Sequence, residues 1–186
     1  MEKGKIDIAL LIVLFTGVVY GTAYIFEYNY HDYYRLPVEF IDLNITTITG
    51  TLLPILLVAG ALFSLGNYIV YFFFNKIENP PLMLQFIILI GVSSILLFAG
   101  FIMGGNRAST KEEYMILKHE EELFVVVTSY SDNLIIAPLD INTETISPEF
   151  QAIEIKSMKE TQIITFEGGL KVKEIKSSKE FKEKMN

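Results

Sequence analysis

The 186-residue chain contains no cysteine and only two histidines, His31 and His119. Without cysteine it has no thiol nucleophile, no disulfide and no cysteine-based zinc site. The sequence also lacks G-x-S-x-G, P-loop, G-x-G-x-x-G and H-E-x-x-H motifs. His119 precedes three glutamates in a charged turn, a pattern more typical of a solvated loop than of a general base. We therefore expect a non-enzymatic protein without catalytic residues or a cofactor.

A metal site is not expected either. His31 is followed by Asp32, but one histidine and one carboxylate without further ligands are a weak signal for metal binding. A solvated histidine near a membrane surface explains this pair better.

Charged residues are missing from three long stretches, which cover residues 8–26, 45–75 and 80–106. Each stretch reaches the roughly 20 residues that a helix needs to cross a hydrocarbon core of about 30 Å. By contrast, 15 of the 22 acidic and 11 of the 15 basic residues follow Asn106. Three such runs leave too little polar sequence to cover them in water. The sequence predicts an α-helical membrane protein with three transmembrane helices, a short interfacial helix and a small C-terminal, mainly-β soluble domain.

The predicted domain boundary lies at residue 106. The transmembrane domain would cover residues 1–106, with an interfacial loop and helix at 27–45 and spans near 7–26, 46–74 and 81–104. The β-rich domain would cover residues 107–186. It carries 11 basic and 15 acidic residues, a net charge of 11 − 15 = −4, which argues against a nucleic-acid partner.

Small residues four apart recur in the predicted spans. They let helix backbones approach closely where lipid gives no hydrophobic drive for association. We expect them to serve packing within the chain rather than a dimer face; they are Gly17, Gly21, Gly60, Ser64, Gly100 and Gly104. No ionisable residue interrupts the spans, which disfavours a proton-coupled carrier.

Residues 28–47 combine clustered tyrosines with one arginine and three carboxylates. Tyrosines at the end of a span are typical of the membrane–water boundary, so an aromatic anchor is one interpretation. A second is a partner-docking surface made by Tyr33, Tyr34 and Arg35, since these residue types are favoured at binding hot spots. A third is an acidic ring of Glu39 and Asp42 at the mouth of an oligomeric pore.

The C-terminal region has β character. Strands are predicted near residues 114–118, 123–128, 134–137, 152–156, 161–166 and 170–175, with Gly168-Gly169 as the hairpin turn that joins the last two. Five or six strands in this length suggest a small sheet or a partly closed barrel.

Positive charge gives a first view of topology. Lys3 and Lys5 outnumber Arg35 across the first run, which favours a cytoplasmic N-terminus and, with three spans, an extracytoplasmic C-terminal domain. We expect a multi-pass protein of a bacterial cell membrane. Its partners would be the lipid bilayer and either a protein partner or further copies of itself, with no nucleic acid.

Two functions remain open at this point. The first is a binding, sensing or accessory module that acts through the β domain and the tyrosine-rich loop. The alternative is an oligomeric pore or channel-like membrane effector with Glu39 and Asp42 at its mouth.

Overall fold

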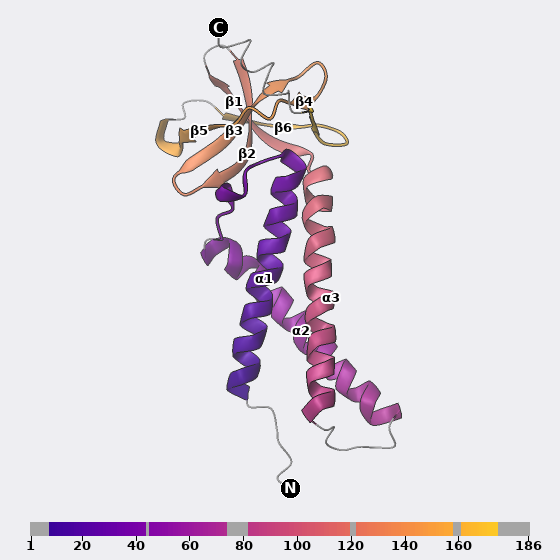
Figure 1. The fold of residues 1–186 in the computed structure, drawn as a ribbon. Helices are drawn as coiled ribbons and strands as arrows, with labels where there is room; N and C mark the ends of the chain where they lie inside the picture. Colours follow the sequence, from indigo (N-terminus) through magenta and orange to yellow (C-terminus); the bar gives the residue numbers. More distant parts are fainter. Residues whose placement is uncertain (1–7, 44, 74–81, 120–121, 158–160, 175–186) are drawn as a thin grey trace. The chain divides into compact units, whose positions relative to one another are not determined.

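The computed structural model describes residues 8–43, 45–73, 82–119, 122–157 and 161–174. These contain three α-helices, two short 3-10 turns and seven strands (Figure 1). The helices and 3-10 turns are α1 (Ile8–Tyr34), η1 (Val38–Phe40), α2 (Ile45–Phe73), α3 (Leu82–Ser109) and η2 (Ile155–Ser157). The strands are β1 (Glu113–His119), β2 (Glu122–Tyr130), β3 (Asn133–Asp140), β4 (Thr145–Ile146), β5 (Gln151–Glu154), β6 (Thr161–Thr165) and β7 (Lys171–Val172).

The chain divides into two compact units. The helical unit comprises Met1–Glu27 and Leu43–Met103, and the β unit comprises Tyr28–Asp42 and Gly104–Asn186. The end of α1, the η1 turn and the last residues of α3 therefore belong with the sheet. The predicted division at residue 106 stays a prediction.

The predicted fold class, with three transmembrane helices, is wrong. Within the described residues one helix, Met83–Ser109, is long and apolar enough to cross a membrane by length and composition. In α2, the described residues give an apolar segment at Leu57–Phe72. The α1 helix carries Glu27, His31 and Asp32 in its final turns. The predicted multi-pass topology, which assumed three spans, is therefore not supported.

The helices of the helical unit pack through a small apolar cluster. Ala59, Val92 and Leu96 are buried there, and Phe15 meets Phe63 edge-to-face with ring centroids 6.1 Å apart. Polar side chains in these helices are satisfied locally: the side chains of Thr16, Thr22, Asn67, Ser93 and Ser94 each donate to the carbonyl four residues earlier.

The α1 helix ends in a Schellman motif. The Leu36 N–H donates to the His31 carbonyl and the Arg35 N–H to the Asp32 carbonyl, both at 3.0 Å. Arg35 takes the left-handed position with φ of 59°. The predicted interfacial helix is also wrong: Pro37 opens only the single 3-10 turn η1, because the chain turns back towards the sheet here.

The seven strands form one curled, mixed sheet in the order β6-β1-β2-β3-β4-β7, and β5 also pairs with β3. All neighbours are antiparallel except β4 and β7. The register between β2 and β3 shifts between Val126 and Thr128. Such a bulge adds twist and helps a sheet to curl.

Alternation along the central strands builds two cores. In β3, Ile135 and Ala137 lie in the main core, while Leu134 and Ile136 lie in the second core. The strand is buried on both faces, so its sequence reads as a continuous apolar run. The main core also contains Tyr34 from α1 and Ala108 from α3.

Most predicted strands match observed ones, but one predicted pairing is wrong. Gly168 and Gly169 do adopt positive φ, 83° and 76°. They do not form a hairpin between β6 and β7, because β6 pairs with β1 and β7 pairs in parallel with β4. A Cβ on Gly169 would lie 2.9 Å from the Lys111 carbonyl oxygen. The two glycines therefore allow a close backbone crossing rather than a two-strand turn.

Candidate interaction site

Three tyrosines on the last turns of α1 anchor this helix end inside the β unit. Tyr30, Tyr33 and Tyr34 form a continuous aromatic group, with centroid distances from Tyr34 of 5.2 Å to Tyr30 and 5.0 Å to Tyr33. The three hydroxyls donate to backbone carbonyls in β2, in α3 and directly before β7. Aromatic rings thus supply apolar packing while their hydroxyls fix the orientation.

The Tyr34 hydroxyl is the most enclosed of the three. It donates to the Ala108 carbonyl at 3.1 Å and lies 2.9 Å from the Tyr114 hydroxyl. Because the single Tyr34 proton goes to Ala108, Tyr114 acts as donor in the second bond. Tyr34 has an exposed fraction of 0% and Tyr114 of 1%. Burial raises the pKa of Tyr34 well above its ordinary value, so the phenol stays neutral.

A lysine extends this network. The Lys111 ammonium donates to the Tyr30 hydroxyl at 3.3 Å, and Tyr30 in turn donates to the Val127 carbonyl at 3.3 Å. The same ammonium lies 4.8 Å from the centroid of the Tyr114 ring. Burial, followed by the Arg107 guanidinium, lowers the pKa of Lys111. The Lys111 ammonium thus contacts both Tyr30 at the end of α1 and Tyr114 in the sheet.

His31 is also buried, with 2% of its surface exposed. Its ring lies 6.2 Å from that of Tyr30. Burial lowers the pKa of His31, and a hydrogen bond to the Pro37 backbone acts in the opposite direction. The imidazole is therefore part of the packing of this helix end rather than a solvated group.

The segment after α1 packs on the turn between β2 and β3. Phe40 meets Tyr130 edge-to-face at 5.6 Å. The Ser131 N–H donates to the Asp42 carboxylate at 3.2 Å. Ser131 sits in the left-handed region with φ of 53°, so this carboxylate supports a strained turn. The contacts join the stretch after α1 to the β2–β3 turn.

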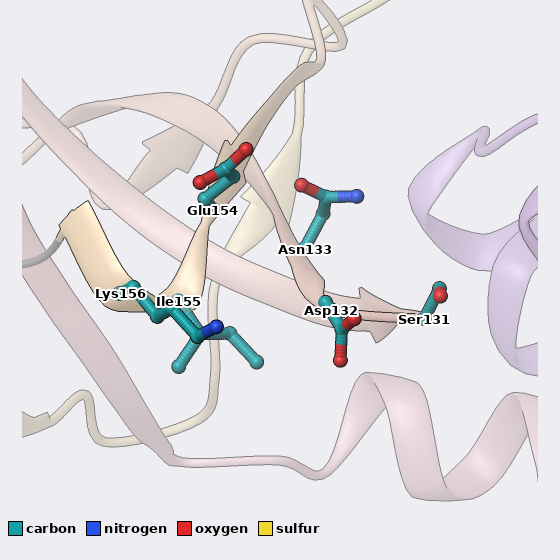
Figure 2. A pocket seen from close by; sticks show the side chains of 6 residues that line it. All are labelled: Ser131, Asp132, Asn133, Glu154, Ile155 and Lys156. Atoms are coloured by element: carbon teal, nitrogen blue, oxygen red, sulfur yellow. The ribbon is translucent and has the colours of Figure 1, made fainter.

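A polar hollow adjoins the same turn. It has a volume of about 440 Å³ and is lined by Ser131, Asp132, Asn133, Glu154, Ile155 and Lys156. Figure 2 shows these side chains on the β2–β3 turn and at the end of β5. The Ile155 N–H donates to the Asp132 carbonyl at 3.1 Å, which ties the two sides together. Within the described ranges, no three histidine, aspartate or glutamate side chains are grouped to hold a metal ion.

The predicted docking residues occupy unlike environments. Tyr34 is fully buried, Tyr33 is half-buried with its hydroxyl donating to the Leu170 carbonyl at 3.2 Å, and Arg35 is exposed. Of the predicted pore-mouth pair, Glu39 is exposed, whereas Asp42 supports the Ser131 turn. Both roles stay predictions.

The predicted packing residues also differ among themselves. A Cβ on Gly100 would lie 2.9 Å from the Thr22 carbonyl oxygen, and one on Gly21 would lie 3.3 Å from Leu97. A Cβ on Gly17 or Gly60 would meet nothing within 4 Å. Gly104 is buried and Ser64 is exposed.

Sequence reasoning missed the contribution of β-unit residues to this region. Tyr114 and Tyr130 lie in strands, and nothing in their local pattern distinguishes them from ordinary core or surface tyrosines. Lys111 carried one signal, since it precedes a strand directly after the last helix. Their role in holding the end of α1 becomes visible only once the fold brings this helix end against the sheet.

A family model described as Type IV pilus biogenesis protein TfpB matches residues 1–169 of the chain. No curated protein and no solved structure matches it.

Proposed function

This chain belongs to the Type IV pilus biogenesis protein TfpB family, and on that premise we propose that it is a non-enzymatic accessory factor in pilus assembly. The family match across most of the chain is the observation that supports the role. Membership implies protein partners in a pilus assembly machinery. We include a second copy of the chain among the candidate partners.

The surface that we propose for partner contact surrounds the β2–β3 turn. We call it the turn surface and define it as Arg35, Val38, Tyr130, Asp132 and Ile155. All five side chains are exposed. Arg35 lies two residues before Pro37 and Val38 directly after it. Phe40, in the same η1 turn as Val38, packs on Tyr130, and the Ile155 N–H donates to the Asp132 carbonyl. An arginine and a tyrosine beside exposed aliphatic groups are the composition favoured at binding hot spots.

Arg35 is the residue with which to test this surface. A left-handed C′ position favours glycine, so an arginine there carries a backbone cost, and its side chain is exposed. Arg35→Gly should remove the exposed guanidinium and relieve backbone strain together. A loss of partner binding in this variant would then report the side chain and not unfolding.

The binding experiment uses the full-length chain with an affinity tag, expressed in a piliated host that lacks the untagged copy. Arg35→Gly and Ile155→Asp should each reduce co-purification of known pilus assembly proteins by an order of magnitude. Ile141→Asp is the matched control, because Ile141 is 45% exposed and Ile155 is 46% exposed. Equal recovery with all variants would rule out the turn surface.

The accessory role itself is tested by pilus counts. A strain without the chain should show fewer surface pili in electron micrographs, and the wild-type chain should restore them. Normal pili in the deletion strain would overturn the role in assembly. Restoration by Arg35→Gly, combined with lost binding, would separate the contact surface from the role.

A further inference from the structure

Among the described residues, the β6 strand ends one side of the sheet, and its own sequence carries neither a charge nor a proline. Its neighbour on the other side is β1, and the strand order among the described residues ends with it. The sequence of β6, Thr-Gln-Ile-Ile-Thr, contains no charge and no proline. Its central side chain, Ile163, is 71% exposed. Natural edge strands usually carry a lysine, a proline or a bulge that prevents pairing with another chain.

The hydrogen-bond pattern determines which groups of β6 face outwards. The Phe166 N–H donates to the Glu112 carbonyl at 2.9 Å, in line with the register that pairs Thr165 with Glu113. Antiparallel strands direct the backbone groups of alternate residues to the same neighbour. Phe166, Ile164 and Gln162 therefore bond towards β1. The N–H and C=O groups of Thr161, Ile163 and Thr165 point to the free edge.

We propose that β6 pairs antiparallel with β6 of a second copy of this chain, about a two-fold axis at Ile163. In this register Ile163 faces Ile163 of the second copy, and Thr161 faces Thr165. All three outward-facing residues of each strand then meet outward-facing residues, which gives six backbone hydrogen bonds. No other antiparallel self-pairing of these five residues uses all three.

The side chains of β6 also favour pairing with β6 of a second copy. Every directly opposed pair among the outward-facing residues is β-branched, and Thr–Thr and aliphatic pairs of this kind stabilise antiparallel sheets. The chain has a net charge of −7, yet the strand is neutral, so two copies meet here without like charges in opposition. A closed two-fold contact of this kind uses the same surface on both copies.

The cysteine-free chain allows a direct test of the register. Across the axis the Cα atoms of Ile163 would lie about 5.5 Å apart, within the range that a disulfide spans. Two Thr165 residues would be displaced by four positions, about 14 Å along the strands. Full-length Ile163→Cys, purified in detergent and mildly oxidised, should form an order of magnitude more disulfide dimer than Thr165→Cys. Equal yields from the two variants would overturn the proposal.

A second variant tests the contact without cross-linking. Ile163→Lys places two ammonium groups directly opposite each other and should shift the protein mass, measured by light scattering in detergent, from dimer to monomer. Gln162→Lys is the control, because residue 162 would face Ile164 and not its own copy. Circular dichroism should match wild type for both. A monomeric wild-type protein at every concentration tested would also overturn the pairing, while the pilus counts would still judge the accessory role.

Discussion

The Tyr34 hydroxyl satisfies two buried partners with one side chain. It holds the Ala108 carbonyl and accepts from Tyr114 in a site closed to water. Tyr34→Phe should therefore lower the free energy of unfolding by about 1–3 kcal/mol, the cost of leaving buried polar groups unpaired. Denaturant titration of the full-length chain in detergent measures the change.

Tyr33→Phe provides the comparison for this prediction. Its hydroxyl is half-buried and bonds to one carbonyl, so its loss should cost about 0.5–1.5 kcal/mol. The double variant Tyr34→Phe/Tyr114→Phe should cost less than the sum of its single changes, since both partners of one bond are removed. A Tyr34→Phe variant as stable as wild type would contradict the network.

His31 gives the β unit a dependence on pH. Burial holds its folded-state pKa below the unfolded value of about 6.5, so the unfolded chain binds the proton more readily. The contribution to stability is complete above pH about 6.5 and is lost as the pH falls from there through the folded pKa. The denaturation midpoint should therefore drop between about pH 7.5 and 5.5.

The second histidine gives this pH prediction an internal control. His119→Gln should retain the drop, whereas His31→Gln should flatten the difference between the two pH values. Most carboxylates titrate near pH 4. Burial raises the pKa of Glu27, but this residue belongs to the helical unit and not to the β unit. If the denaturation midpoint of His31→Gln changed with pH as much as that of wild type, another group would be responsible for the pH dependence.

Single residues show where sequence reasoning stops. The tyrosine cluster was visible as a pattern, but its members could be an anchor or a docking surface, and local spacing does not distinguish the two. Tyr34 is buried because strands about 80 residues later fold over it. The positive φ of Arg35 could not be predicted from its sequence, because the left-handed position of a Schellman motif is usually occupied by glycine.

Among the elements, local pattern located strands better than it located their partners. The runs around Val125 and Ile135 carry β-branched alternation, which is a local property. The pairing of β7 with β4 depends on contacts distant in sequence. For the same reason, Pro37 and the apolar spacing after it predicted a helix, whereas packing of Phe40 on Tyr130 leaves only a 3-10 turn.

Gly100 of α3 lies against the backbone of α1 within the helical unit. Gly100→Ala would bring a methyl group to 2.9 Å from the Thr22 carbonyl oxygen, a backbone atom that cannot rotate away. We expect a loss of about 1–3 kcal/mol in unfolding free energy. Gly17→Ala, with open space around it, should gain about 0.5–1 kcal/mol through helix propensity. The same sign of change in both variants, measured by denaturation in micelles, would refute this packing.

At the scale of the whole molecule, uncharged runs overestimated the number of membrane spans. The uncharged stretch 8–26 continues within α1 into Glu27, His31 and Asp32 and ends at the buried Tyr34. A count of uncharged residues does not register this continuation. Among the described residues, Met83–Ser109 is the helix that is long and apolar enough to cross a membrane, so a membrane association of this family member would depend chiefly on α3.

A charge placed in the middle of α3 tests that dependence. Ile95 is 57% exposed, near the centre of Met83–Ser109. Ile95→Arg should cost about 2.5–3.5 kcal/mol of insertion free energy, because the guanidinium would enter hydrocarbon. Asn106→Arg should cost much less, since an arginine near a helix end reaches the interface. After alkaline washing, wild type and Asn106→Arg should stay in the membrane pellet, while Ile95→Arg should move substantially to the supernatant. If all three stayed in the pellet equally, α3 would not be the segment that holds the chain in the membrane.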